Sequence, residues 1–279
     1  MGFAYPSILL LLAIKEDSDS RGFYSLSTKK VYQLNLPEAR GRKCFSSCGW
    51  LITLGLDLEI HLFNPFSRTR VQIRLPPQST FPNQYDLETD SEPDIYDPET
   101  DSEPDIYDPE TDSEIEREYI RRVFMRKVIL SSRPSKRIPC EDDDEKCVVM
   151  GMFSKHCKLA FLRLGDEIWT PIYTPEGIGI SDVIYMNGQF YALSDEGKLV
   201  IVDISSPDPK TIEFAEPPEC YNQCTHFYNP HFYLVESVGE LFMLARYEDD
   251  CEGEDEEFGD GIVEGEYIEY GTHNYDKYF

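Results

Sequence analysis

The stretch Gly49–Pro77, GWLITLGLDLEIHLFNPFSRTRVQIRLPP, decides the fold class. Trp50–Leu54 is an apolar run, and apolar residues then alternate with other residues over 58–63 and 71–75. This period of two is typical of β-strands. Asn64-Pro65 is a turn dipeptide, and a double proline, which cannot donate to a strand ladder, ends the stretch. We therefore predict three short strands joined by tight turns.

The same pattern recurs later in the chain. Gly188–Pro218, GQFYALSDEGKLVIVDISSPDPKTIEFAEPP, has the same order of strands, turns and final double proline, in 31 residues instead of 29. Shorter copies lie at Gly22–Glu38 and Phe232–Tyr247. Small antiparallel sheets repeated at this spacing favour the blades of a β-propeller. The alternative is a chance repeat inside an all-β sandwich.

Several consecutive segments also resemble one known family. They are FYSLSTKKVYQLNLPEARGRKCFSSCGWLITLGLDLEIHLFNPFSRTRVQIRLPP, RKVILSS, DVIYMNGQFYALSDEGKLVIVDI and YLVESVGELFMLARY, at 23–77, 126–132, 182–204 and 233–247. Together they resemble the KIB-type β-propeller domain of plant F-box proteins. The resemblance implies a substrate-recruiting subunit of a cullin-based ubiquitin ligase, in which an N-terminal F-box binds the adaptor and the propeller presents a binding face.

The two ends of the chain differ from that family pattern. The first blade-like strand begins within ten residues of Met1, which leads us to expect no F-box in this chain. After Tyr247 the chain turns acidic, and we expect the C-terminal part of the propeller to be missing or diverged. The sequence leaves open whether the array of blades closes, and whether the ligase adaptor and cullin are partners.

Composition divides the chain into four segments. We predict the first propeller blades over 1–84, a disordered acidic insert over 85–118, the remaining blades over 119–247 and an acidic, mostly disordered tail over 248–279. The insert repeats TDSEPDIYDPE with a period of eleven residues, and each copy contains two prolines and a single aliphatic residue. Such a composition cannot bury enough surface to offset chain entropy. In the tail we expect one strand near Tyr267–Tyr270.

The acidic charge is concentrated in two places. The net charge is −27, and Asp86–Glu118 holds sixteen acidic residues while Asp249–Asp260 holds eight. Without those segments the remainder is close to balanced. Duplex nucleic acid is therefore not an expected partner, because phosphates require a basic surface. Basic proteins fit the acidic segments better.

The cysteines and the N-terminal segment indicate the cellular compartment of the protein. The eight cysteines come without a secretory signal, because Ile8–Ile14 is short, apolar and preceded by no basic residue. That segment is also too short to span a bilayer, so we expect no membrane association. We predict a reduced intracellular protein, cytoplasmic or nuclear, with cysteines that act as small buried hydrophobic residues.

In the two full copies of the repeat, four hydroxyl residues precede an acid by three positions. This spacing resembles the sites of acidophilic kinases, and phosphate would deepen the negative charge of the insert. The candidates for phosphorylation are Thr89, Ser91, Thr100 and Ser102. Because such spacing is common in any acidic run, the alternative is a solvated spacer.

Metal sites find little support in the sequence. Cys44/Cys48 and Cys220/Cys224 both have C-x₃-C spacing, which zinc sites allow, and His226 lies near the second pair. The pairs lack the turn residues of zinc knuckles, so accidental proximity of buried thiols is the better interpretation. The start of the insert has Ser91 where a calcium loop needs glycine. We expect no metal and no cofactor.

The sequence gives no sign of catalytic chemistry. The sequence has no nucleophile elbow, P-loop, dinucleotide fingerprint or zincin motif. His61 alternates with core positions and fits a position on a blade face better than the role of a base. We therefore predict that the protein is not an enzyme.

Trp50 and Trp169 are the two candidates for partner binding, because tryptophan often anchors interfaces. Packing between adjacent blades is the alternative for both. The function that we predict is a non-catalytic protein–protein interaction module, with a protein partner bound on one propeller face. The alternative function is an acidic decoy or chaperone-like protein that binds basic partners through its acidic segments.

Overall fold

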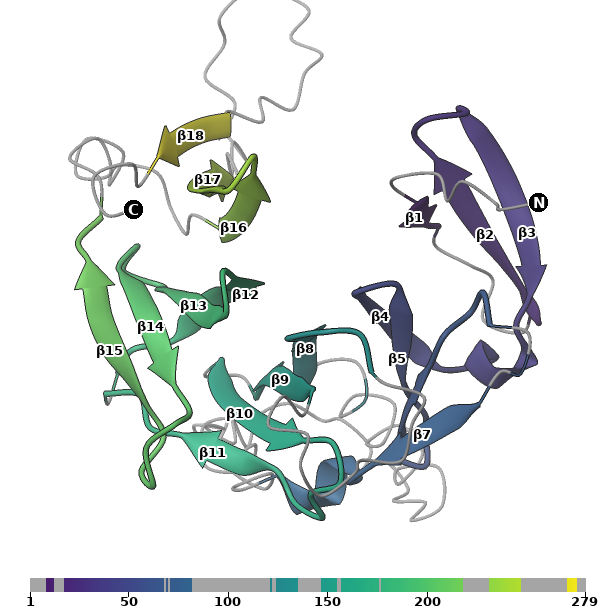
Figure 1. The fold of residues 1–279 in the computed structure, drawn as a ribbon, viewed down its shortest axis with the longest axis horizontal. Coiled ribbons are helices and arrows are strands. Elements are labelled where there is room, and N and C mark those ends of the chain that lie inside the picture. Colours follow the sequence, from purple (N-terminus) through teal and green to yellow (C-terminus); the bar gives the residue numbers. More distant parts are fainter. Residues whose placement is uncertain are drawn as a thin grey trace, which may run out of the picture. The chain divides into compact units, whose positions relative to one another are not determined.

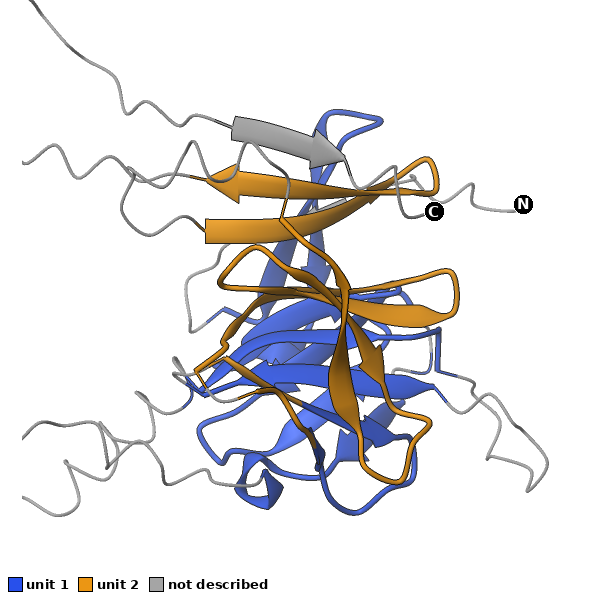
Figure 2. Ribbon diagram, turned by 90° about the vertical axis from the view of Figure 1, so that its left-hand side faces the viewer, with its two compact units in different colours: residues 1–155, 160–171 blue, residues 156–159, 172–279 orange. Residues whose placement is uncertain are grey.

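The computed structural model describes the chain in pieces. The described residues are 9–12, 18–67, 69, 71–81, 121, 124–134, 147–154, 157–175, 177–217, 231–246 and 270–274. They form two compact units, residues 1–155 with 160–171 and residues 156–159 with 172–279 (Figure 2). Nearly all regular structure in the described part is β (Figure 1). The exceptions are two short 3-10 helices, η1 (Pro37–Ala39) and η2 (Gln78–Thr80).

The strands pair into five small antiparallel sheets, with neighbours in the order of the chain. The first sheet contains β1 (Leu9–Leu11), β2 (Ser20–Ser25) and β3 (Lys30–Asn35). The second contains β4 (Lys43–Ser47), β5 (Trp50–Leu54), β6 (Ile60–Phe63) and β7 (Gln72–Leu75). The third contains β8 (Met125–Leu130), β9 (Val148–Phe153), β10 (Lys158–Arg163) and β11 (Thr170–Ile172). The prediction of an all-β, propeller-like array of small antiparallel sheets is confirmed.

The second unit repeats this arrangement. Its four-stranded sheet contains β12 (Ile180–Met186), β13 (Gln189–Ser194), β14 (Leu199–Asp203) and β15 (Lys210–Ala215). Its three-stranded sheet contains β16 (His231–Ser237), β17 (Glu240–Arg246) and β18 (Tyr270–Asn274). The strand expected near Tyr267–Tyr270 is therefore present, but it lies a few residues later in the chain.

The two long sequence repeats fold alike. Gly49–Pro77 forms β5, β6 and β7, and Gly188–Pro218 forms β13, β14 and β15. In each sheet one further strand, β4 or β12, precedes the repeat and completes four strands. Within the second sheet, the middle strand β5 is buried at every position, whereas the edge strand β7 is buried only at Leu75. The hydrophobic core of this sheet thus lies along its middle.

Hydrophobic clusters among the described residues hold neighbouring sheets together. Phe23 and Leu36 of the first sheet region pack against Leu51 and Phe63 of the second sheet. A larger cluster joins the second and third sheets, and in it the ring of Phe81 stacks on Trp169 with centroids 4.3 Å apart. In the second unit, side chains of β13 and β14 pack against those of β16 and β17.

Polar contacts reinforce the packing between the second and third sheets. The Lys43 ammonium donates to the Met125 carbonyl at 2.7 Å, and the Leu130 amide donates to the Ser47 hydroxyl at 2.9 Å. These bonds satisfy backbone groups on the edge of β8 that its own sheet leaves without a strand partner. The inner edges of the two sheets are therefore joined by side chains of β4.

Candidate functional site

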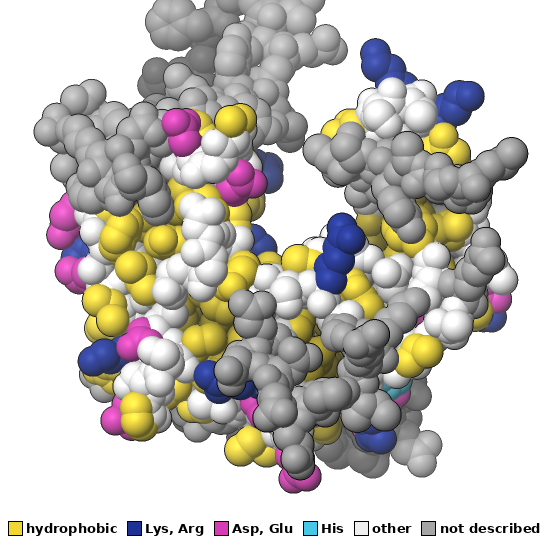
Figure 3. All heavy atoms as spheres, viewed as in Figure 1, with side chains coloured by type: hydrophobic (Ala, Val, Ile, Leu, Met, Phe, Trp, Pro, Cys, Tyr) yellow, Lys and Arg dark blue, Asp and Glu magenta, His cyan; other side chains and the backbone are white. Residues whose placement is uncertain are grey.

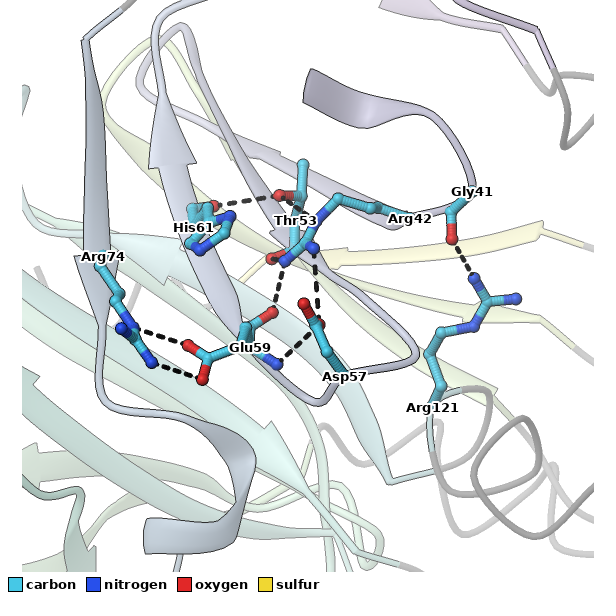
Figure 4. A network of polar contacts seen from close by, with 8 residues as sticks. All are labelled: Gly41, Arg42, Thr53, Asp57, Glu59, His61, Arg74 and Arg121. Carbon is cyan, nitrogen blue, oxygen red and sulfur yellow. Dashed lines mark hydrogen bonds and ion pairs between the residues drawn. The ribbon is translucent and has the colours of Figure 1, made fainter. Parts of the chain in front are cut away.

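One end of the second sheet carries a closed network of charged side chains (Figure 4). Arg42 is its centre, because its guanidinium donates to the Thr53 hydroxyl at 3.0 Å and to the Glu59 carbonyl, and lies 3.5 Å from the Asp57 carboxylate. The Asp57 carboxylate also accepts the Glu59 amide at 3.0 Å. The network fixes the turn between β5 and β6.

The same network extends across the sheet to β7. The Arg74 guanidinium forms two hydrogen bonds with the Glu59 carboxylate, at 2.7 and 2.5 Å. Burial and the nearby Arg42 charge lower the pKa of His61, although Asp57 and Glu59 oppose this shift. His61 is therefore a neutral imidazole at neutral pH.

The charged side chains at this end of the sheet bind one another and so have a structural role. The guanidinium groups of Arg42 and Arg74 are bound to the carboxylates of Asp57 and Glu59, so the charges neutralise one another. In the described part of the chain no cluster of three or more His, Cys, Asp or Glu side chains is arranged to hold a metal ion. No helix that the structure describes is long and apolar enough to cross a membrane.

The opposite end of the sheet presents apolar side chains to solvent. Phe66 and Val71 lie in the connection between β6 and β7, and both are exposed. The Phe66 ring contacts Phe23, with centroids 5.5 Å apart, which brings this connection beside β2 of the first sheet. We call the exposed side chains of Phe66 and Val71 the turn surface.

Short side-chain bonds hold the turn surface in place. The Phe66 amide donates to the Asn64 side chain at 2.9 Å, and the Ser67 amide donates to the Asn64 carbonyl at 3.1 Å. Asn favours such bonds in turns. The apolar side chains are thus displayed on a constrained turn, which reduces the entropy lost on binding.

Both tryptophans lie inside the first unit. Trp50 and Trp169 are buried members of the cluster between the second and third sheets. The Trp169 indole also donates to the Pro76 carbonyl at 3.1 Å. This burial accords with the alternative that the tryptophans pack between blades. Partner anchors must therefore be sought among exposed side chains.

The remaining predicted sites fall mostly outside the described residues. Thr89, Ser91, Thr100 and Ser102 all lie there, as do Cys220, Cys224 and His226. Of the first cysteine pair, Cys44 donates to the Arg42 carbonyl at 3.4 Å, and Cys48 donates to the Leu130 carbonyl at 3.6 Å. Burial raises the pKa of the Cys44 thiol. Phosphorylation of the insert stays a prediction.

Sequence reasoning did not single out the turn surface. Phe66 stands in the turn segment NPFSRT, where an apolar residue has no place in the alternating core pattern. An apolar side chain inside a polar turn was the available signal, because turns lie at the surface. Alternation alone did not distinguish this residue from core residues of the adjoining strands.

Comparison with known proteins identifies the family. The sequence profile described as the KIB1-4 beta-propeller matches residues 23–267. The chain belongs to the KIB1-4 beta-propeller family. A curated protein of Arabidopsis thaliana, whose name assigns it provisionally to the F-box proteins, is 29% identical over 116 residues. That match covers 40% of this chain and 30% of the relative, so the chain matches about a third of the relative's length.

Two solved propellers show low similarity to the KIB1-4 chain. The β-propeller domain of Cps50 (Swd1) from Myceliophteria thermophila has a TM-score of 0.38 and 10% identity, over 95% of this chain and 74% of that one. The WD40 domain of SCAP from fission yeast has a TM-score of 0.31 and 8% identity, over 96% and 74%. At these scores the family assignment rests on the profile match alone.

Proposed function

We propose that this KIB1-4 propeller is a non-catalytic protein-interaction module that binds a protein partner on its turn surface. The observation that carries the proposal is the contrast between the two ends of the second sheet. One end binds its own charges in the Arg42 network, whereas the other exposes Phe66 and Val71 on a constrained turn. Exposed apolar side chains on rigid turns favour a protein ligand.

The family assignment supports a more specific role. Because the matched relative carries an F-box name, we propose that the partner is a substrate recruited to a ubiquitin ligase, with the F-box function supplied outside this propeller. Substrate recruitment requires only binding, which agrees with a turn surface that holds no nucleophile or acid–base pair. A cytoplasmic or nuclear location is part of this proposal, and a fluorescent fusion in plant cells would test it.

Affinity purification of three variants tests the binding surface. The tagged chain, the double variant Phe66→Asp/Val71→Asp and the control Leu56→Asp would be expressed in plant cells and their bound proteins quantified by mass spectrometry. Leu56 is also exposed, but it lies in the turn between β5 and β6 at the other end of the second sheet. We expect the double variant to lose a defined partner and the control to keep it.

The same purification separates the proposed roles. Ligase adaptor and cullin recovered with the partner would support substrate recruitment, whereas a partner recovered without them would support a binding module independent of the ligase. A partner kept by the double variant, but lost at raised salt and on deletion of residues 86–118, would instead favour the decoy that binds basic proteins.

A further inference from the structure

Two thiols of the first unit lie against the same short segment of chain. Cys48 stands in the turn between β4 and β5, and its Sγ atom donates to the Leu130 carbonyl at 3.6 Å. Cys147 immediately precedes β9, and its Sγ atom donates to the Ser132 carbonyl at 3.1 Å. The two acceptors are two residues apart at the end of β8, a spacing of about 7 Å along an extended chain. The fold thus brings together two cysteines that are far apart in the sequence.

Hydrogen bonds of neighbouring residues hold both cysteines beside this segment. The Leu130 amide donates at 2.9 Å to the hydroxyl of Ser47, which precedes the first cysteine. The Val148 amide, which follows the second cysteine, donates to the Ser131 hydroxyl at 2.9 Å. The Ser131 amide in turn donates to the Val148 carbonyl at 2.9 Å. Each thiol is therefore anchored through a residue next to it in the chain.

The electrostatics of the buried thiol indicate the same proximity. Burial is the main cause that raises the pKa of Cys147, and hydrogen bonds with Ser132 and Ser131 oppose the rise. The charge of the Cys48 sulfur adds to the rise, which requires that the two sulfurs lie close to each other. On the face drawn in Figure 3, hydrophobic side chains, with which cysteine is grouped, lie over β4 and β8. Cys147 is thus a neutral thiol at neutral pH.

The two thiols differ in their access to solvent. Cys48 is exposed, whereas Cys147 is only 5% exposed. An exposed cysteine beside a second thiol is the arrangement of redox-sensitive pairs, in which one residue meets the oxidant and the other resolves the product. Inside cells, where thiols are kept reduced, such disulfides form transiently.

We propose that Cys48 and Cys147 form a peroxide-sensitive pair that closes to a disulfide. The Cys48 thiolate attacks hydrogen peroxide, so that an S–O bond forms, the O–O bond breaks and a first water leaves. The Cys147 thiolate then attacks the Cys48 sulfur, so that an S–S bond forms, the S–O bond breaks and a second water leaves. Two thiols are oxidised by two electrons in all, one peroxide is reduced, and the two thiol protons end in the two waters. This pair does not depend on the proposed protein partner.

Peptide mapping after peroxide treatment tests the pair. Trypsin places Cys147 in the peptide 147–155, and places Cys48 in the peptide 44–68 together with Cys44. Cys44 is the matched control, because it packs against the cluster that joins the first and second sheets. Folded Cys44→Ser and Cys48→Ser chains would be treated with hydrogen peroxide, alkylated and digested without reductant. We expect at least about ten times more of the 44–68/147–155 disulfide in Cys44→Ser, and its reversal by dithiothreitol.

The same treatment of unfolded chains separates proximity from intrinsic reactivity. Cys44 and Cys48 are close in the sequence, so in concentrated urea the two variants should form the disulfide with Cys147 in similar amounts. Circular dichroism should show that both variants fold like the wild type, because Cys48 is exposed and Cys44 is only partly buried. The oxidised wild-type chain should also unfold at a higher urea midpoint than the reduced chain, because a cross-link restricts the unfolded state.

Three results would overturn the proposal. The first is equal formation of the disulfide in the two folded variants, or none in either, because the fold would then not select Cys48. The second is oxidation of Cys48 to sulfinic acid while Cys147 stays a free thiol. The third is a disulfide of Cys147 with Cys140, which lies outside the described residues and in the separate tryptic peptide 138–146.

Discussion

The polar network around Gly55 requires a residue without a side chain at this position. A Cβ atom at this position would collide with the Arg42 guanidinium and the Asp57 carboxylate. Gly55 is not among the glycines with positive φ, so the requirement is for space and not for an unusual backbone conformation. The tight fit follows from the approach of Arg42 to the carbonyl of Glu59 across the β5–β6 turn.

Gly55→Ala should therefore destabilise the first unit. We expect the free energy of unfolding to fall by about 1 kcal/mol, because Arg42 and Asp57 have to move and the hydrogen bonds that they make weaken. Gly22→Ala is the matched control, because its added Cβ would meet Leu12 at 3.2 Å and Gln33 at 3.5 Å and would displace no charged side chain. Urea denaturation measures both. A smaller loss for Gly55→Ala than for Gly22→Ala would contradict this account of the network.

The lowered pKa of His61 makes stability depend on pH. Because its folded pKa lies below the unfolded value, the folded chain binds fewer protons than the unfolded chain near and below about pH 6.5. The free energy of unfolding should therefore fall as the pH drops from about 7.5 to about 5.5. Urea midpoints at both pH values measure the effect, and His61→Gln should reduce the difference. An unchanged difference in His61→Gln would assign the effect to other groups.

At the level of elements, three two-residue hairpins share one design. Cys48-Gly49, Asn187-Gly188 and Val238-Gly239 each join consecutive strands, with positive φ at both residues. This is the type I′ turn, whose twist matches that of paired strands. Asparagine and glycine suit it best, and valine suits it poorly.

Exchanging the first turn residue should change stability in opposite directions. Val238→Asn should raise the free energy of unfolding by about 1 kcal/mol, because asparagine tolerates the left-handed conformation. Asn187→Val should lower it by a similar amount at the equivalent hairpin of the neighbouring sheet. Urea denaturation of the two variants, compared with the wild type, provides the test. Changes of the same sign would show that turn conformation does not control these hairpins.

The side chain of Asp182 joins two sheets of the second unit through hydrogen bonds to backbone amides. Its carboxylate is buried and accepts the Val183 amide at 2.8 Å and the Leu234 amide of β16 at 2.9 Å. Asp182→Ala would leave the Leu234 amide without this acceptor, at a cost of about 1–3 kcal/mol. Hydrogen exchange should show faster exchange at Leu234 in this variant, and Asp182→Asn should fall between it and the wild type. Unchanged exchange at Leu234 would contradict the proposed link.

Strands and turns could be predicted from sequence because their signals are local. Alternation over 58–63 and the Asn64-Pro65 turn specify β6 and its end without knowledge of the rest of the chain. The contacts between sheets could not be predicted in this way. The hydrogen bond of Asp182 to Leu234 joins residues 52 positions apart, and no pattern near either residue indicates it.

For the whole molecule, the family could be predicted from sequence, whereas the proposed binding surface could not. The resemblance of residues 23–77 and the later segments to KIB-type propellers is confirmed by the profile match over 23–267. The tryptophans were chosen as anchors for their chemical type, whereas accessibility depends on how sheets pack. The turn surface depends on the contact of Phe66 with Phe23, which no local sequence pattern indicates.

The binding of a partner at the turn surface is the central claim for the molecule as a whole. Hydrogen–deuterium exchange of the full chain, with and without the protein that co-purifies with it, tests this claim most directly. We predict that the partner slows exchange at the amides of Phe66 and Val71 and leaves Leu56 and Asp57 unchanged. Protection confined to the β5–β6 turn, or to residues 86–118, would contradict the claim.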